Sequence, residues 1–299
     1  MIKHHNVSAI KPKRVVILGA SGFVARDLAE HLAGLGIDTR SVGSAQVNLL
    51  EPESAAKLKE VVRPGDGLVV TSALTPEKGK DVRTFMKNLA MIQNLCAFFE
   101  QAACSQVIYL SSDAVYDDST ALVREATLRT GPGLYGLMHV AREEMLRFAL
   151  GRSRTPLCVV RPCAIYGAGD THNSYGPNRF MRTALKERKV ALFGMGEEQR
   201  DHISIRDVSR FLVECLEQRS EGAVNIVTGS AISFYDLAQQ IIRLCPHDVE
   251  LECLPRATPI THRHFDVSLR LKEFPGFQIT SLDVGLDKMM NELMDKGKT

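Results

Sequence analysis

The 299-residue sequence lacks the features that mark several large classes of protein. No apolar run reaches the roughly 18 residues of a membrane-spanning helix, and residues 1–12 are polar and basic, with no apolar signal-peptide core. A formal net charge of +2, without a basic run, gives no indication of a nucleic-acid or membrane partner. The composition therefore predicts a cytoplasmic globular protein that binds neither.

Paired cysteines are also lacking. The seven cysteines form no Cys-x-x-Cys pair, and most stand within apolar stretches, which predicts buried free thiols in a reducing compartment. The histidines after residue 170 are dispersed and unsupported by cysteines, so we expect no metal site. The adjacent His4 and His5 are predicted to belong to a disordered tail.

The sequence does contain an apolar strand that breaks into a glycine-rich turn and continues as a helix. Gly19 is expected to form the bend, and Gly22 lets the main chain approach a pyrophosphate that the following helix N-terminus attracts. The residues expected to contact a dinucleotide here are Gly19, Ser21, Gly22, Phe23 and Val24. An ordinary strand–turn–helix without a ligand is the alternative.

Strand and helix patterns then alternate in the order that builds a parallel sheet. Strands are expected over 39–43, 67–72, 106–110 and 157–161, and helices over 54–62, 82–103 and 135–150. This alternation predicts a Rossmann-type, doubly wound α/β fold whose ligand lies at the carboxyl ends of the strands. Further helices are expected over 180–186, 234–244 and 282–293.

Two of these segments carry polar side chains that are suited to catalysis. Ser111, Ser112 and Asp113 follow the strand 106–110 abruptly, and Tyr135 stands at the start of the next helix. His139 is four residues further on, which places it on the same helix face as Tyr135, one turn away.

These stretches resemble the extended short-chain dehydrogenase/reductases of the nucleotide-sugar epimerase/dehydratase group. Three later segments, 161–167, 200–208 and 224–229, are similar to the family's in the same order. The resemblance implies that Ser112 is the catalytic hydroxyl, Tyr135 the acid/base, and Asn88 a helix residue that completes the site. It further implies cofactor contacts from Gly43, Ser44, Ala73, Ser111, Tyr135, His139 and Pro162.

One departure from the family's pattern is His139, which stands where the family has a lysine. In the family that lysine holds the nicotinamide ribose, and its charge lowers the pKa of the tyrosine. A histidine is shorter and is charged only if its pKa is held up. Three interpretations stay open: His139 acts as a weaker or proton-shuttling partner, another cation takes over, or the site binds cofactor without dehydrogenase chemistry.

Asp113 narrows the reaction that the resemblance implies. Dehydratases of the group carry Thr-Asp-Glu where this chain has Ser112-Asp113-Ala114, so 4,6-dehydration is disfavoured. We expect 4-keto reduction or epimerisation of a nucleotide-linked sugar by hydride transfer, with Tyr135 moving the proton. Alternatively, Asp113 only accepts hydrogen bonds from backbone N–H groups in its loop.

The cofactor is expected to be NADP or NAD. NAD-preferring relatives place an aspartate at the end of the second strand, but the position is Gly43 here and no carboxylate is near. Ser44, with Arg26 or Arg40, is available to receive a 2′-phosphate, which slightly favours NADP. The alternative is that both arginines are solvated surface charges.

The part of the chain after residue 166 is expected to build the substrate pocket. We predict a dinucleotide-binding domain over 12–166, to which 203–228 returns, and a smaller C-terminal α/β lobe over 167–202 and 229–295. The residues that the resemblance assigns to the substrate are Asn178, Arg179, Arg200 and Arg263. For the last two, an ion pair with Asp201 or Asp266 is the alternative.

Two functions therefore stay open at this stage. The first is a nicotinamide-dependent enzyme acting on a nucleotide-linked sugar, which the presence of Ser112, Tyr135 and Asn88 favours. The second is a dinucleotide-binding regulatory or assembly protein that lost the lysine, which His139 favours. The resemblance also implies a homodimer formed through the helices around 82–99 and 135–150.

Overall fold

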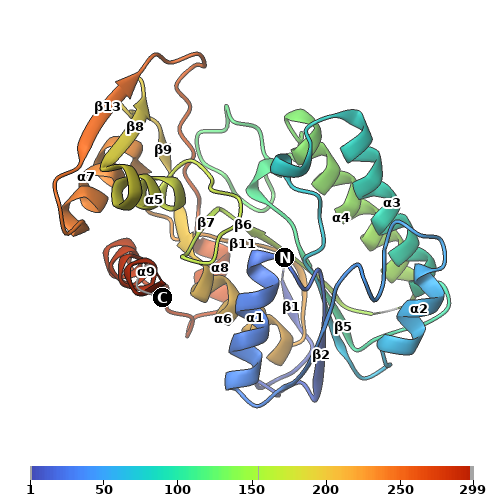
Figure 1. Cartoon of the computed structure of the whole chain (residues 1–299). Coiled ribbons are helices and arrows are strands. Elements are labelled where there is room, and N and C mark those ends of the chain that lie inside the picture. The colour runs from blue at the N-terminus through green and yellow to red at the C-terminus, as the bar shows by residue number, and fades with distance from the viewer. Residues whose placement is uncertain (1, 154, 297–299) are drawn as a thin grey trace.

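A seven-stranded sheet forms the centre of the computed structural model, which describes residues 2–153 and 155–296 (Figure 1). In spatial order its strands are β1 (Lys3–His4), β11 (Ser220–Ile226), β6 (Leu157–Pro162), β5 (Gln106–Leu110), β4 (Gly67–Val70), β2 (Arg14–Leu18) and β3 (Asp38–Val42). All neighbouring strands run parallel except β1, which pairs antiparallel with β11. The predicted doubly wound α/β fold is confirmed.

Helices cover both faces of this sheet. Side chains alternate along β2, so that Val15 and Ile17 pack on one face and Val16 and Leu18 on the other. The first face packs against α1 (Phe23–Gly34), α6 (Ile205–Glu217) and α8 (Ser268–Glu273). The second packs against α2 (Ser54–Val61), α3 (Val82–Phe99) and α4 (Gly133–Ser153). Burial on both faces explains why the central strands β2, β4, β5 and β6 are largely apolar runs.

A separate apolar core holds the remaining elements together, at one end of the molecule in Figure 1. Its helices are α5 (Pro177–Glu187), α7 (Phe234–Leu244) and α9 (Leu282–Lys296). Short strand pairs accompany them: β7 (Ala164–Tyr166) with β10 (His202–Ser204), β8 (Lys189–Phe193) with β13 (Glu250–Leu254), and β9 (Gln199–Arg200) with β12 (Ile232–Ser233).

The prediction of a disordered tail around His4 and His5 was wrong. Lys3 and His4 form β1, and the two ring nitrogens of His4 lie 3.0 Å from Ser220 Oγ and 3.0 Å from the Glu273 carbonyl oxygen. His5 Nε2 lies 2.6 Å from Glu221 Oε2. Partners more than 200 residues away in the chain order this segment, which a local polar sequence does not reveal.

The thiols and helix bounds show smaller differences from expectation. All seven cysteines are free; Cys104, Cys158, Cys163 and Cys215 are buried, and Cys253 is exposed. The helix α4 begins two residues before Tyr135, and α6 forms a helix that the sequence analysis did not assign. None of the helices within the described residues is long and apolar enough to cross a membrane.

Candidate functional site

The glycine-rich turn lies between β2 and α1, where the sequence predicted it. Gly19 has a φ of +105°, a conformation that favours glycine, and its N–H donates to the Val42 carbonyl at 3.0 Å. A Cβ on Gly22 would lie 3.1 Å from the Gly19 carbonyl oxygen. No side chain caps the N-terminus of α1, so its first N–H groups remain available to a ligand.

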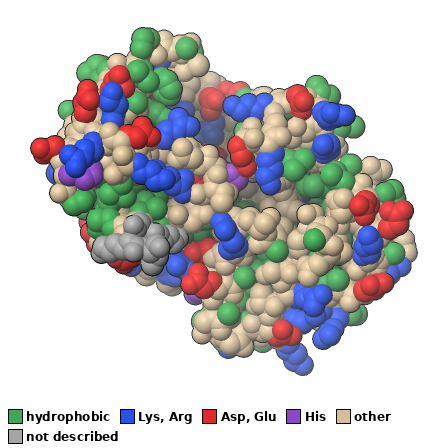
Figure 2. Space-filling view, viewed as in Figure 1, with side chains coloured by type: hydrophobic (Ala, Val, Ile, Leu, Met, Phe, Trp, Pro, Cys, Tyr) green, Lys and Arg blue, Asp and Glu red, His purple; other side chains and the backbone are tan. Residues whose placement is uncertain are grey.

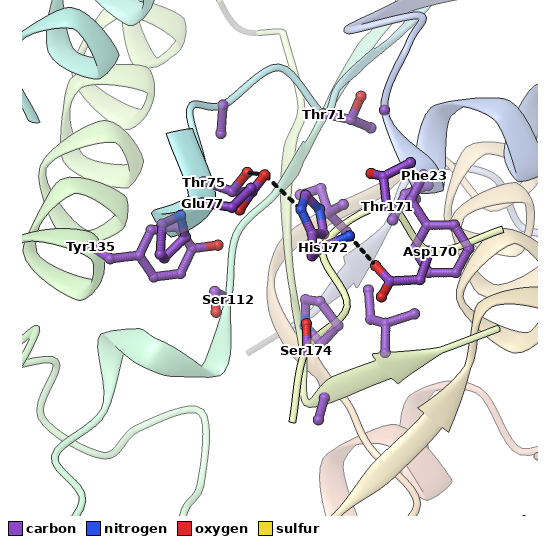
Figure 3. Close-up of a pocket in the computed structure, with 18 of the residues that line it drawn as sticks. Phe23, Thr71, Thr75, Glu77, Ser112, Tyr135, Asp170, Thr171, His172 and Ser174 are labelled. Carbon is purple, nitrogen blue, oxygen red and sulfur yellow. Dashed lines mark hydrogen bonds and ion pairs between the residues drawn. The ribbon is translucent and has the colours of Figure 1, made fainter. Parts of the chain in front are cut away.

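A cleft of about 610 Å³ connects this turn to the start of α4 (Figure 3). In the space-filling view the surface is hollowed between the lobe that carries α5 and α7 and the side formed by α3 and α4 (Figure 2). The predicted site residues that line the cleft are Ser21, Gly22, Phe23, Val24, Ala73, Ser111, Ser112, Asp113, Tyr135, His139, Pro162 and Arg179. Those that do not line it are Gly19, Gly43, Ser44, Asn88, Asn178, Arg200 and Arg263.

Tyr135 and Ser112 face the same part of the cleft (Figure 3). The Ser112 hydroxyl accepts a hydrogen bond from the Ala114 N–H at 3.1 Å and lies 3.4 Å from Asp113 Oδ1. Burial raises the pKa of Tyr135 to about 12, with the Asp113 charge adding to this effect and Ser112 and Arg142 opposing it. The phenol is therefore protonated at neutral pH and is a hydrogen-bond donor.

His139 lies on the same face of α4, with its ring edge-on to that of Tyr135 at a centroid distance of 4.8 Å. It is only 2% exposed, and its Nδ1 lies 2.6 Å from the hydroxyl of the buried Tyr109. Its Nε2 is buried without a hydrogen-bond partner among the described residues. Burial, with the charge of Arg142 acting in the same direction, lowers the pKa of His139 to about 3. The imidazole is neutral at physiological pH.

Arg142, one turn further along α4, was not singled out by the sequence analysis. It is fully buried, its Nη2 donates to the Ser72 carbonyl at 2.6 Å, and its guanidinium lies 5.2 Å from the centroid of the Tyr109 ring. Asn88 approaches it at 3.5 Å through Oδ1 and hydrogen-bonds both N and O of Leu74. Asn88 therefore fixes the segment after β4 rather than lining the cleft.

A buried ion pair supports the strand ends beneath the site. Glu143 accepts hydrogen bonds from Arg161 Nε at 2.9 Å and Nη2 at 2.7 Å, from the Ser111 hydroxyl at 2.7 Å, and from Arg129 Nη1 at 2.7 Å. Although burial acts to raise it, Arg161 and these neighbours lower the pKa of Glu143 to about 2. This network joins α4 to β5 and β6, and it occupies the Ser111 hydroxyl.

Two predicted substrate residues, Arg200 and Arg263, lie near Asp113 but have other partners than the alternatives considered. Arg263 Nη1 lies 3.1 Å from Asp113 Oδ2, and its Nη2 contacts Asp118. Arg200 donates to the carbonyl and hydroxyl oxygens of Thr261 at 2.6 and 2.7 Å. Burial raises the pKa of Asp113, while Arg263 acts in the opposite direction.

The alternative acids are engaged elsewhere. Asp201 accepts hydrogen bonds from the N–H groups of Thr228 and Gly229, and Asp266 pairs with Arg124 at 2.9 Å. The Asp113 carboxylate receives no backbone N–H bond among the described residues; its partners are Arg263 Nη1 at 3.1 Å and the Ser112 hydroxyl at 3.4 Å.

Asn178 and Arg179 stand next to each other at the start of α5 but lie differently. The Asn178 side chain is buried, accepting from the Gly167 N–H at 3.0 Å and donating to the Ile165 carbonyl at 3.1 Å. Arg179 lines the cleft, with its Nε 3.2 Å from the Asn173 carbonyl. Only the second of the pair presents its side chain to a ligand.

The end of β3 is the place where a 2′-phosphate was expected. The Gly43 N–H donates to Gln46 Oε1 at 3.1 Å, and Ser44 and Arg40 are exposed. Arg26 reaches across from α1 to donate to the Gly169 carbonyl at 3.0 Å. Of the three side chains considered for a 2′-phosphate, Arg26 is thus engaged with the loop after β7.

Charged residues that the sequence analysis missed stand on both sides of the cleft. Glu77, in the short 3₁₀ helix η1 (Pro76–Lys78), lies 2.6 Å from His172 Nδ1, and Asp170 Oδ1 accepts from the His172 N–H at 3.0 Å (Figure 3). Lys78 and Lys80 also line the cleft. Both loops follow strands of the fold, which is the one signal that points to them. Among the described residues no cluster of His, Cys, Asp or Glu is suited to a metal ion.

A largely parallel sheet with a glycine turn, an uncapped helix and a polar cleft at its strand ends has the features of a Rossmann-type α/β fold. The model of the NAD dependent epimerase/dehydratase family matches residues 15–227, and the chain belongs to that family. The resemblance noted in the sequence is thereby confirmed.

Solved structures share this fold over nearly the whole chain. A GDP-L-fucose synthetase from Naegleria fowleri bound to NADP is 16% identical with a TM-score of 0.86, covering 100% of this chain and 99% of its own. A UDP-glucose 4-epimerase from Thermus thermophilus in complex with NAD is 18% identical with a TM-score of 0.84, covering 94% and 99%. A UDP-glucose 4-epimerase from Thermotoga maritima with UDP-glucose is 19% identical with a TM-score of 0.81, covering 96% and 100%.

Proposed function

We propose that this protein is a nicotinamide-dependent oxidoreductase or epimerase that acts on a nucleotide-linked sugar, with 4-keto reduction as the favoured reaction. The observation that carries the proposal is a single cleft that joins the glycine turn to Ser112, Tyr135 and His139. Family membership and the substrates named for the similar structures support the same class of chemistry.

The residues present fit a nicotinamide dinucleotide. Gly22 leaves no Cβ between the turn and a pyrophosphate, and the uncapped N-terminus of α1 offers N–H donors to it. His139 lines the other end of the cleft, and its buried Nε2 has no partner among the described residues, so a ribose hydroxyl there would satisfy it. When bound, the cofactor supplies or accepts the hydride.

The chain's own residues handle the proton. Tyr135 is protonated at neutral pH, so it is ready to donate to a carbonyl oxygen that gains charge, and the adjacent Ser112 hydroxyl stabilises the same oxygen. With Tyr135 protonated, the resting site is ready to reduce a carbonyl group rather than to oxidise an alcohol. The Arg263–Asp113 pair at 3.1 Å holds the neighbouring loop in place.

NADP is the cofactor that we favour over NAD. The sequence has no carboxylate at residues 40–46, the end of β3, so nothing there repels a 2′-phosphate. Ser44 and Arg40 are exposed in this region. For the substrate, Arg179, Lys78 and Lys80 line the cleft and are suited to the diphosphate of a nucleotide sugar.

A homodimer through α3 and α4 is part of the proposal. The large apolar side chains that these helices expose are Val82 (65%), Met86 (56%), Leu137 (42%) and Phe148 (74%). Exposed apolar side chains gathered on one pair of helices mark an interaction surface. Light scattering at micromolar concentration would show a species of about twice 33.0 kDa, and a monomer would contradict it.

The alternative function is a dinucleotide-binding regulatory or assembly protein without turnover. The observation that favours it is the neutral, buried His139 in place of a charged lysine. Both functions predict cofactor binding, so binding alone does not separate them.

Calorimetric titration with NADP⁺ and NAD⁺, followed by a panel of nucleotide 4-keto sugars with NADPH, tests the proposal. We expect micromolar binding, tighter for NADP⁺, and turnover that Tyr135→Phe abolishes while its cofactor affinity stays within about threefold. Binding without turnover on any sugar would support the regulatory alternative. Absence of binding to either dinucleotide would contradict both.

A further inference from the structure

The hydroxyl of Tyr109 fixes which nitrogen of His139 carries the proton. Tyr109 is 1% exposed, and burial raises its pKa well above the ordinary value. The only hydrogen-bond partner of its hydroxyl among the described residues is His139 Nδ1 at 2.6 Å. A neutral phenol with one available acceptor donates to it, so Nδ1 is the acceptor and Nε2 carries the hydrogen. The Nε2–H is therefore a buried donor without a partner among the described residues, on a side chain that lines the cleft.

Arg142 brings a permanent charge to the same helix face. Tyr135, His139 and Arg142 are spaced at i, i+4 and i+7, which aligns their side chains along α4. The guanidinium is held by the Ser72 carbonyl at 2.6 Å and by the Tyr109 ring at 5.2 Å. No carboxylate within residues 2–153 and 155–296 forms an ion pair with it; the charge of Glu143, the next residue of α4, acts on the same side chains, Tyr109 and His139.

A buried cation without an ion-pair partner is costly, and such groups are usually paired with a carboxylate. Here Arg142 stands between the strand end at Ser72, next to cleft-lining Thr71 and Ala73, and the helix turn that carries His139. The place where its charge is useful is the cleft, where negative charge develops on the Tyr135 phenol when it gives up its proton.

We propose that His139 and Arg142 divide the two tasks of a single lysine. His139, held by Tyr109, donates a hydrogen bond into the cleft, and Arg142 supplies the fixed positive charge as a positioning residue that touches neither substrate nor cofactor. The inference rests on the proposed function for its catalytic meaning, but its structural part is open to test without turnover.

The groups around Tyr135 define what a pH experiment would report. Asp113 and Glu77 are the negative groups that raise its pKa, the Ser112 hydroxyl and Arg142 lower it, and His139 is neutral beside it. Removal of Arg142 leaves the two carboxylates without the opposing cation of α4. The phenolate of Tyr135 then forms less readily.

The tautomer is tested on the protein without ligand. In protein labelled with ¹⁵N-histidine, with the His139 signal assigned by its loss in His139→Gln, we expect the Nε2–H tautomer unchanged between pH 5 and 8. Tyr109→Phe removes the donor to Nδ1, and the Nδ1–H tautomer should then appear. Detection of the Nδ1–H tautomer in the unsubstituted protein, or of a charged His139 in this pH range, would overturn this part.

The charge is tested by a double-variant cycle read out as thermal unfolding. His139→Lys alone places a second cation one turn from Arg142 and should lower the melting temperature. The same change in an Arg142→Met background should lower it by at least about 3 °C less, because the like charge is gone. Equal losses in both backgrounds would show that Arg142 places no charge at position 139.

Turnover adds the readout that links the pair to catalysis. In the oxidising direction, which needs the phenolate, Arg142→Met should lower kcat about tenfold at neutral pH, for a pKa change of about one unit. The change in KM should be smaller than the change in kcat. The loss of kcat should shrink as the pH rises and should be largely absent in Arg142→Lys. Arg152→Met is the matched control. Like Arg142, Arg152 lies over an aromatic ring, here that of Phe148 in α4, but it lies away from the cleft. A pH-independent loss, or one equal in Arg142→Lys, would contradict the charge role.

The two possible failures are distinguishable. If the proposed function is wrong, no variant turns over any sugar, but the tautomer and the melting temperatures still show whether His139 and Arg142 act as described. If only the inference is wrong, turnover is observed while the double-variant cycle is additive and the pH profile of Arg142→Met is unchanged.

Discussion

The two sides of the cleft are built on different principles. The turn side, formed by Gly19, Gly22 and the start of α1, offers backbone N–H groups and depends on the absence of side chains. The α4 side depends on side chains that contact one another, with His139 on Tyr109, Arg142 on Ser72 and Tyr109, and Glu143 on Arg161. A backbone site tolerates change in neighbouring side chains, whereas in a packed side-chain network a change in one member affects the others.

The largest effect should come from the α4 side. We expect Tyr135→Phe to lower kcat/KM on a 4-keto sugar about 10³-fold, because the phenol lines the cleft with Ser112 and is protonated at neutral pH. Steady-state kinetics measure this, and unchanged NADPH affinity is the control. Retention of a tenth of the activity would mean that another group donates the proton.

The buried ion pair of the α4 side should dominate stability. Arg161→Met leaves the buried Glu143 without its bidentate partner and should lower the free energy of unfolding by about 3–5 kcal/mol in urea titrations. Arg147→Met removes a more exposed arginine from the same carboxylate and should cost less than about 1 kcal/mol. Similar losses in the two variants would show that burial does not set the strength of this network.

On the turn side, a single methyl group should be enough to remove binding. In Gly19→Ala, the Cβ would lie 2.8–3.0 Å from Thr71 Oγ1 and from the backbone of Ser72, at a φ of +105°. We expect at least about a 100-fold loss of dinucleotide affinity by calorimetry. Gly34→Ala at the end of the same helix, where nothing lies within 4 Å, is the control and should bind normally.

As the pH falls, the buried histidines should lower the stability of the fold before the carboxylates do. The pKa values of His139 and His202 are about 3 because both are buried, so below pH 6.5 the unfolded chain binds protons that the folded protein refuses. Stability should fall with decreasing pH by about 1.4 kcal/mol per unit for each histidine. Glu143 has a pKa of about 2, so its protonation begins to lower the stability only when the pH falls below 4.5, the ordinary pKa of a glutamate.

Denaturant titrations between pH 7 and 5 measure this loss. His202→Phe should remove about half of the slope, because the substituted side chain packs beside Phe234 and does not titrate. An unchanged slope would mean that His202 is not neutral in the folded protein.

The smallest effect is expected at the contact between η1 and the loop after β7, which both line the cleft. Glu77→Gln removes one charge of the Glu77–His172 contact at 2.6 Å, in which both side chains are about one-third exposed. We expect KM for the sugar to change by about twofold to threefold and the difference to decrease at high salt. A change of tenfold or more would show that this contact holds the cleft closed.

The turn side was readable from the sequence because its function lies in a short local pattern. An apolar strand, two glycines and a helix start are adjacent in the chain, and they predicted the turn at Gly19 and Gly22. Ser112 and Tyr135 were found by the same means, since one ends a strand and the other begins a helix.

The partners of His139 were not readable in this way. Tyr109 is 30 residues away in a buried strand, and only the side-to-side alternation of β5 directs its hydroxyl toward α4 rather than α1. Arg142 looked like one charge among many on a helix, and nothing local shows that it is buried. The pairs formed by Asp113 with Arg263 and by Glu77 with His172 join loops about 150 and 95 residues apart, which spacing cannot predict.

The two residues of β1 have a consequence for solubility. By pairing antiparallel with β11, Lys3 and His4 occupy hydrogen-bonding positions that the last parallel strand would otherwise present to solvent. An uncovered, flat strand edge is a template for pairing with another molecule. Removal of residues 2–10 would therefore take Ile2 out of the apolar core and expose β11, and the shortened protein should self-associate through its sheet rather than through its helices.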